Sequence, residues 1–180
     1  ADCVAAMRAA SDTPVTVKTR IGIDDHDDYA FLRGFVETVA GAGCRTFIVH
    51  ARKAWLGGLS PKENRTVPPL RYEDIYRLKR DFPETLVEIN GGFRDLDAVA
   101  EQLEQVDGVM IGRAAADDPF LFEAVDRRFY GEEGSPRTRH EIVESHLGYI
   151  EDWLGRGCSF LRLVRPMLNL FAGQRGSRAW

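Results

Sequence analysis

The chain has 180 residues and a net charge of −4 at pH 7, with 44% hydrophobic and 29% charged residues. This length and composition are typical of a soluble globular protein of one domain, or of one domain and part of another. No apolar stretch is long enough for a membrane-spanning helix, and the first residues lack the pattern of a signal peptide. Because the chain begins with Ala1 rather than Met, we expect it to start within a longer protein.

Four short apolar segments, rich in β-branched residues, predict strands. They are Val15–Val17, Phe47–Val49, Leu86–Ile89 and Val109–Ile111. A polar or glycine-rich turn follows each of them, and a helical pattern comes next. Near-continuous apolar segments between helices are typical of parallel strands that are buried on both faces.

The helical patterns that follow these strands differ in length but share apolar residues at helical spacing. They cover Asp28–Ala42, Tyr72–Phe82, Asp95–Val106 and Asp117–Tyr130. In the first helix, this spacing predicts a buried face made of Phe31, Phe35, Val36 and Val39. The last begins with two aspartates and a proline, which are favoured at helix starts.

The strictly alternating order of strands and helices predicts an α/β fold with a parallel sheet. A complete TIM barrel has eight such units in about 250 residues, so four units are half of one. After a turn-rich linker at Gly131–Pro136, the pattern changes to helix on helix, with Thr138–Leu154 and Ser159–Phe171. We therefore predict a partial barrel over residues 1–134 and the start of an all-α domain over residues 135–180.

Each predicted strand stops at a residue that can bind an anion or do chemistry. These residues are Lys18, His50, Asn90 and the pair Gly112 and Arg113. In parallel barrels, functional groups gather at the carboxyl ends of the strands. Lys18 suits the pyrimidine edge of a flavin ring, and His50 can donate a hydrogen bond to the ring or a phosphate. Two alternatives stay open. Lys18 could form an ion pair with an acidic residue, and His50 could be a buried histidine bonded to a backbone carbonyl.

Two glycine turns follow the last two predicted strands. Asn90, Gly91 and Gly92 lead into one helix, and Gly112 and Arg113 lead into the next. Glycine lets the backbone approach an anion closely, and a helix N-terminus offers free N–H groups. The paired turns therefore predict a site for a phosphate-bearing ligand.

The loop from Ala51 to Arg65 and the C-terminal tail are rich in cations. The loop holds four cationic residues and Trp55, a mixture that suits a nucleic-acid strand. After Asp152 the chain has no acidic residue. The arginines of this tail are Arg156, Arg162, Arg165, Arg175 and Arg178. The alternatives are an ordered surface loop whose Trp packs on the barrel, and a solvated helix face with a frayed end.

The three cysteines are Cys3, Cys44 and Cys158. Their odd number and wide spacing argue against a disulfide framework and a zinc site. We therefore expect no metal, a reducing cytoplasmic setting, and cysteines that act as small buried hydrophobic residues.

The strings TVKTRIGID, FIVHARKAWLGGLSPKENR, EINGG and GVMIGRAA resemble the tRNA-dihydrouridine synthases, in particular the A-type bacterial subfamily. The resemblance runs from about Pro14 to Gly131 and continues more weakly to Trp180. It implies an oxidoreductase with a TIM barrel that binds FMN, followed by a helical tRNA-binding domain. In such flavoproteins NADPH reduces the flavin, a hydride passes from FMN N5 to uridine C6, and a cysteine protonates C5.

The resemblance also implies roles for individual residues. Positions that match FMN-binding residues of the family are Lys18, His50, Asn90, Gly91, Gly92, Gly112 and Arg113. Positions expected to contact tRNA are Arg52, Lys62, Arg65, Arg175 and Arg178. The family's proton-donating cysteine and a flavin-binding glutamine belong to the N-terminal half of the barrel, and no matching string occurs here. We therefore expect no catalytic residue in this chain and no activity of the chain alone.

Half a barrel is expected to leave two open edge strands and an unburied apolar inner face, for which the N-terminal half is the expected partner. Three other functions stay open. The first is another FMN barrel oxidoreductase, similar to dihydroorotate dehydrogenase. The second is a non-catalytic RNA-binding fragment, and the third is a phosphate-binding barrel enzyme of sugar or amino-acid metabolism.

Overall fold

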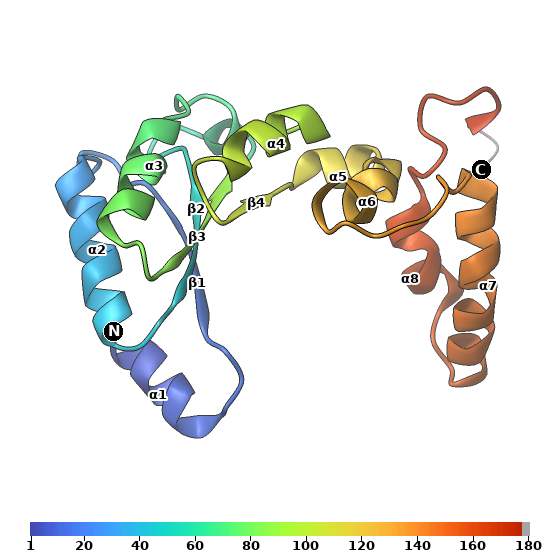
Figure 1. Ribbon diagram of the computed structural model, residues 1–180, viewed down its shortest axis with the longest axis horizontal. Coiled ribbons are helices and arrows are strands. Elements are labelled where there is room, and N and C mark those ends of the chain that lie inside the picture. Colours follow the sequence, from blue (N-terminus) through green and yellow to red (C-terminus); the bar gives the residue numbers. More distant parts are fainter. Residues whose placement is uncertain (178–180) are drawn as a thin grey trace. The chain divides into compact units, whose positions relative to one another are not determined.

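The computed structural model describes residues 1–177, which form two compact units (Figure 1). The first unit comprises residues 1–93 and 97–111, and the second comprises residues 94–96 and those from 112 onward. No helix in the described part of the chain combines the length and apolar character that a membrane crossing requires. The division into functional domains after residue 134 stays a prediction.

The first unit is built on a four-stranded sheet with the order β1-β2-β3-β4. The strands are β1 (Thr16–Arg20), β2 (Thr46–His50), β3 (Leu86–Asn90) and β4 (Gly108–Met110). All three neighbouring pairs are parallel. This sequential parallel order confirms the α/β prediction and is the arrangement found in part of a TIM barrel.

Helices follow the strands, as predicted. They are α2 (Tyr29–Gly41) after β1, the short 3₁₀ helix η1 (Glu63–Arg65) and α3 (Tyr72–Asp81) after β2, and α4 (Leu96–Leu103) after β3. Another helix, α1 (Asp2–Ala10), precedes β1. Asp28 caps α2, because its carboxylate accepts the N–H of Phe31 at 2.7 Å. Helix α4 is shorter than the predicted Asp95–Val106, because the chain leaves the helix after Leu103.

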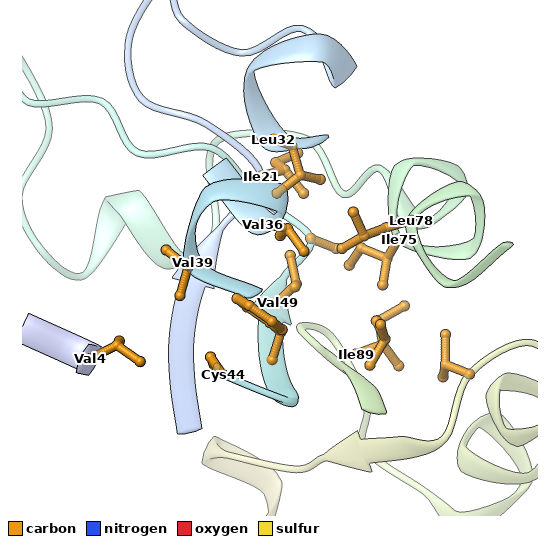
Figure 2. Packing of buried hydrophobic residues seen from close by; sticks show 14 of the residues in the cluster. Val4, Ile21, Leu32, Val36, Val39, Cys44, Val49, Ile75, Leu78 and Ile89 are labelled. Carbon is orange, nitrogen blue, oxygen red and sulfur yellow. The ribbon is translucent and has the colours of Figure 1, made fainter. Parts of the chain in front are cut away.

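One face of the sheet packs against α2 and α3 and forms the core. Alternate residues of β2 and β3 on this face have no exposed surface, among them Val49 and Ile89. Figure 2 shows them beside Val36 of α2 and Ile75 and Leu78 of α3. Each such side chain contributes about 1.5–3 kcal/mol when it leaves water completely, so this layer is the main source of stability.

The predicted buried face of α2 is partly wrong. Leu32, Val36 and Val39 are buried, whereas Phe31 and Phe35 are 42% and 38% exposed. Residues at spacings of four and three lie on one stripe of a helix, and the stripe that contains Leu32 faces the sheet. The two phenylalanines lie one residue earlier and are therefore turned about 100° away from it.

The other face of the sheet is mainly polar. Its strand positions include Lys18 and Arg20 of β1, His50 of β2, and Glu88 and Asn90 of β3, because residues at a spacing of two share a face. Of its apolar members, Ile48 is 7% exposed and Leu86 is 53% exposed. The expected unburied apolar inner face is therefore only partly apolar, and its polar set is the functional candidate.

The second unit is made of short helical segments and one long helix. They are α5 (Arg113–Asp117), η2 (Pro119–Ala124), α6 (Val125–Phe129), α7 (Arg139–Gly155), α8 (Phe160–Val164) and η3 (Arg165–Met167). Helix α7 confirms the predicted helix, and Thr138 and Glu141 form a capping box at its start. Among its apolar residues, Ile150 is buried, whereas Leu147 is 48% exposed.

Two predicted helices of this unit differ from the structure in part. The predicted helix Asp117–Tyr130 begins as expected, because Asp118 accepts the Phe120 N–H at 3.2 Å and Pro119 stands in the first turn. It runs first as the 3₁₀ helix η2 and then as α6. The predicted helix Ser159–Phe171 ends at Val164 and passes into 3₁₀ and turn structure around Pro166.

The carboxylate of Glu123 forms a set of hydrogen bonds at the start of the second unit, which we call the Glu123 clamp. Glu123, whose side chain is 8% exposed, binds the Arg127 guanidinium through two bonds of 2.8 Å and accepts the Arg137 backbone N–H at 2.7 Å. The hydrogen bond from Arg127 is the main cause that lowers the pKa of Glu123 to about 2. The charged form is thus stabilised by folding.

We expect Glu123→Gln to destabilise the second unit by about 2 kcal/mol near pH 7, since charge-assisted hydrogen bonds are lost. Because folding lowers this pKa, the stabilisation is complete above the unfolded value near 4.5 and is lost as the pH falls toward about 2. The loss of stability and its pH dependence are both measured by urea unfolding. Trp153 fluorescence reports the unfolding in a chain that also carries Trp55→Phe and Trp180→Phe. A difference between the Glu and Gln forms that stays constant from pH 6 to pH 2 contradicts the clamp.

Candidate functional site

The polar face carries a cluster at the carboxyl ends of its strands. Arg20, His50 and Asn90 stand side by side in the register of β1, β2 and β3. The sequence predicted that the first strand stops at Lys18. This is wrong, because β1 continues to Arg20. The long side chain of Lys18 nevertheless reaches the cluster, and Nζ lies 3.3 Å from Asn90 Oδ1. Asn90 in turn donates to the Met110 carbonyl at 2.7 Å, which fixes its amide.

Lys18 is an uncompensated cation. The residue as a whole is exposed, and within residues 1–177 it forms no ion pair, so its described partner is the neutral amide of Asn90. Burial, and then the positive charge of Arg20, lower the pKa of Lys18. Both causes penalise the ammonium form in the folded chain. An acceptor or an anion placed against Nζ would relieve that penalty.

His50 is held in one tautomer by its neighbour. Nδ1 accepts the backbone N–H of Arg52 at 3.1 Å, so the neutral ring carries its proton on Nε2. In the alternative considered from the sequence, the ring of His50 would instead bond to a backbone carbonyl. The Cε1–Nε2 edge of the ring lies over Gly91, since a Cβ built there would be 3.3 Å and 3.4 Å from these atoms. His50 thus presents an N–H donor beside the glycine turn.

The Gly91-Gly92 turn requires glycine for two reasons. Both residues have positive φ angles, +125° and +90°. In addition, a Cβ on Gly92 would lie 2.8 Å from Tyr72 Oη and 2.9 Å from a methyl group of Leu70. The Tyr72 hydroxyl donates to the Gly91 carbonyl at 2.6 Å, and its ring stacks on Phe93. Tyr72 therefore fixes the turn, a role that the sequence analysis missed.

The second predicted glycine turn begins the second unit. Gly112 precedes α5 with φ −112°, and Arg113 is the first residue of that helix. No atom lies within 4 Å of a Cβ built on Gly112, so packing does not require glycine there. The joint phosphate site of the two turns stays a prediction.

Three arginines add positive charge next to Lys18. Burial, then the charges of Arg52 and Arg65, lower the pKa of Arg20. Arg20 also donates to the carbonyls of Lys53 and Asn64, both at 2.9 Å. Arg52 donates to the Pro68 carbonyl. Arg20 was not predicted from the sequence, although its position two residues after Lys18 places both on one face of the strand.

Hydrogen bonds and an ion pair hold the cationic loop, residues 51–65, in a defined conformation. The Asn64 side chain accepts the Trp55 N–H at 2.8 Å and donates to the Trp55 carbonyl at 2.7 Å. Lys53 pairs with Asp27 at 3.0 Å and also donates to the Asp24 carbonyl at 3.0 Å. Trp55 is half-buried, so the loop is an ordered surface loop. Among the predicted tRNA contacts in it, Lys62 and Arg65 are exposed and Arg52 is half-buried.

We expect Asn64→Ala to loosen this loop without unfolding the sheet. Two hydrogen bonds are lost, and each contributes about 1 kcal/mol, so the loop opens roughly thirtyfold more often. Limited proteolysis between residues 55 and 63, together with the fluorescence of Trp55, reports the opening. Gly57→Ala is the matched control, because a Cβ there meets no atom within 4 Å. Equal cleavage of the two variants would show that Asn64 does not hold the loop.

The remaining predicted positions lie elsewhere. Arg175 is exposed in the second unit, and Arg178 lies outside the described residues. Cys44 is buried at the amino end of β2 and donates to the Thr46 carbonyl at 3.3 Å. Cys3 is exposed on α1 and Cys158 is half-buried, so the expectation that every cysteine is buried is wrong for both. Arg8 of α1 donates to the Gly43 carbonyl, which places that helix at the amino end of the sheet as well.

Comparison with known proteins gives one consistent result. The model of the family described as Dihydrouridine synthase (Dus) matches residues 1–180. Proteins named tRNA-dihydrouridine(20/20a) synthase match the whole chain at 53% identity in Synechocystis sp., 51% in Salmonella typhimurium and 50% in Vibrio cholerae. The chain covers 54%, 54% and 55% of those proteins, respectively. It thus spans about half the length of the curated relatives it matches.

Proposed function

Because the chain belongs to the dihydrouridine synthase family, we propose that it forms the flavin-binding portion of an enzyme that reduces uridine to dihydrouridine in tRNA. The observation that carries this proposal is the placement of Lys18, without an ion-pair partner in residues 1–177, against Asn90 and near the carboxyl end of the sheet. The names of the relatives suggest that the uridines are those at positions 20 and 20a.

The donor set of the site fits FMN. Lys18 offers an ammonium group and His50 an N–H at Nε2, both suited to the acceptor atoms of the flavin ring. Asn90, Gly91 and Gly92 offer backbone at the end of β3 to its phosphate, and Gly112 and Arg113 complete the proposed cofactor set. When bound, FMN supplies hydride transfer, and NADPH is the proposed reductant.

Positive charge at this end of the sheet is suited to RNA. Arg52 and Arg65 lie close enough to Arg20 to lower its pKa, so the cluster gains from an anion. Lys62 extends it along the exposed loop. We propose that these side chains contact phosphates of tRNA and that Arg175 and Arg178 do so from the helical domain. The proposed setting is the cytoplasm.

The proton donor to uridine C5 is proposed to come from the N-terminal half of the barrel. In the first unit, Cys44 is buried at the amino end of the sheet, opposite to the site, and Cys3 lies on α1 at that same end. Neither reaches the cluster formed by Lys18, His50 and Asn90. The chain alone is therefore expected to form no dihydrouridine, and steady turnover by it would refute this point.

Flavin retention tests the proposal. The purified chain, and the same chain extended N-terminally to the length of its relatives, are mixed with FMN and passed through a gel-filtration column. Retained flavin absorbance in either protein, together with binding of tRNA, supports the proposal. Two colourless proteins would overturn it and favour a non-catalytic RNA-binding protein if tRNA is retained. A yellow protein without affinity for tRNA would favour another FMN barrel oxidoreductase.

A further inference from the structure

The second unit holds a cavity of about 760 Å³ at the start of α7. Arg137, Arg139 and His140 line it from the beginning of that helix, and Arg175 lines it from the C-terminal turns. None of the described lining residues is acidic. A cavity of this size is suited to a small organic ligand rather than to a single ion.

Two of these cations carry charge that the described chain leaves unbalanced. Arg137 lies near Glu123 and Glu141, and its charge contributes to lowering the pKa of both. By contrast, Arg139 and Arg175 form no ion pair within residues 1–177. Arg139 is held in place, because Nε donates to the Leu170 carbonyl at 2.7 Å. The remaining guanidinium N–H groups match an anion with several oxygens, such as a phosphate.

Aromatic rings form another part of the lining. The Phe171 ring lies edge-on to His140, with their centroids 5.1 Å apart. Phe120 supports Arg139, whose guanidinium carbon is 3.7 Å from the centre of its ring. Rings and guanidinium planes are the groups on which proteins stack unpaired bases. The same cavity therefore offers partners to both a phosphate and a base.

We propose that this cavity binds a phosphorylated nucleoside. Arg139 and Arg175 bind the phosphate, and Phe171 and His140 contact the base. For the source of the ligand the inference rests on the proposed function, which supplies two candidates, an unpaired nucleotide of the tRNA and the 2′-phosphoadenosine part of NADPH. Both candidates contain a nucleoside with a phosphate, which is the chemistry that the cavity recognises. Competition experiments distinguish the two candidates.

The first experiment measures binding of adenosine 5′-monophosphate to the purified chain, without flavin, by isothermal titration calorimetry. We expect saturable binding that Arg175→Glu weakens about tenfold or more, since a charge-assisted contact is replaced by repulsion. Arg162→Glu is the matched control, because Arg162 is also an exposed arginine of this unit and does not line the cavity. Inorganic phosphate and adenosine are each expected to bind at least tenfold more weakly than the monophosphate.

Absence of saturable binding, equal weakening by the two variants, or equal affinity for inorganic phosphate or adenosine would overturn the inference. Displacement of the monophosphate by a short single-stranded RNA, but not by NADP⁺, identifies an RNA nucleotide as the ligand. The reverse result identifies the reductant, and failure of both to compete overturns the inference. Because this cavity lies in the second unit and the experiment omits FMN, its outcome is independent of the flavin-retention test.

Discussion

Replacing Lys18 with methionine is expected to weaken FMN binding about tenfold to hundredfold while leaving the sheet folded. The loss follows from removing one charge-assisted contact, which contributes about 1.5–3 kcal/mol. Folding is expected to tolerate the change, because burial and Arg20 already penalise the charge in the native state. Methionine keeps a similar length and apolar stem. Fluorescence quenching of free FMN gives the affinity, and thermal unfolding of the flavin-free protein gives the stability.

Thr16→Val is the control for this experiment. Thr16 lies on the same strand and the same face as Lys18, one pair of residues earlier, and belongs to none of the proposed contacts. We expect unchanged FMN affinity for Thr16→Val. If Lys18→Met binds FMN as the unsubstituted protein does, Lys18 has no part in the cofactor site. If both variants lose affinity together with stability, the effect belongs to the strand rather than to the ammonium group.

Replacing Gly92 with alanine is expected to destabilise the first unit by about 3 kcal/mol. A positive φ costs a non-glycine residue on the order of 1 kcal/mol, and overpacking a tight site costs about 1–3 kcal/mol more. The new Cβ would lie 2.8 Å from Tyr72 Oη and 2.9 Å from Leu70. Relief of that clash would move Tyr72, whose hydroxyl binds the Gly91 carbonyl. Urea unfolding monitored by far-ultraviolet circular dichroism measures the cost.

Gly58→Ala separates the two contributions. Gly58 has a similar positive φ of +80°, but a Cβ there meets no atom within 4 Å. It should therefore show the backbone cost alone, about 1 kcal/mol. A loss at Gly92 no greater than that at Gly58 would mean that Leu70 and Tyr72 move aside freely. In that case the packing under the glycine turn would not be what fixes its shape.

The cationic cluster has a consequence for salt dependence. Arg20 donates to the carbonyls of Lys53 and Asn64, and Arg52 donates to the Pro68 carbonyl. The charges of Arg52 and Arg65 act on Arg20, and positive charge gathered in this way favours a polyanion, whose binding weakens as salt rises. The proposed cofactor-binding donors and the proposed RNA-binding cations thus lie in the same unit.

Local patterns in the sequence determined the elements of this protein. The alternation of apolar strands with amphipathic helices predicted the parallel sheet, and Asp28 and Thr138 are caps where helix starts were predicted. These features were predictable because a strand, a helix or a cap depends on residues that are neighbours in sequence. The strand pattern likewise placed His50 and Asn90 at the carboxyl end of the sheet, whereas Lys18 lies within β1.

The tertiary structure decided which side chains meet. That Lys18 reaches Asn90 across the sheet, that Tyr72 fixes the glycine turn and that Arg20 supports a distant loop depend on the register of strands far apart in sequence. The same holds for α2, where packing on the sheet selected Leu32 over Phe31 as the buried residue. Periodicity defines a stripe of apolar residues, but the neighbouring element decides which part of that stripe leaves water.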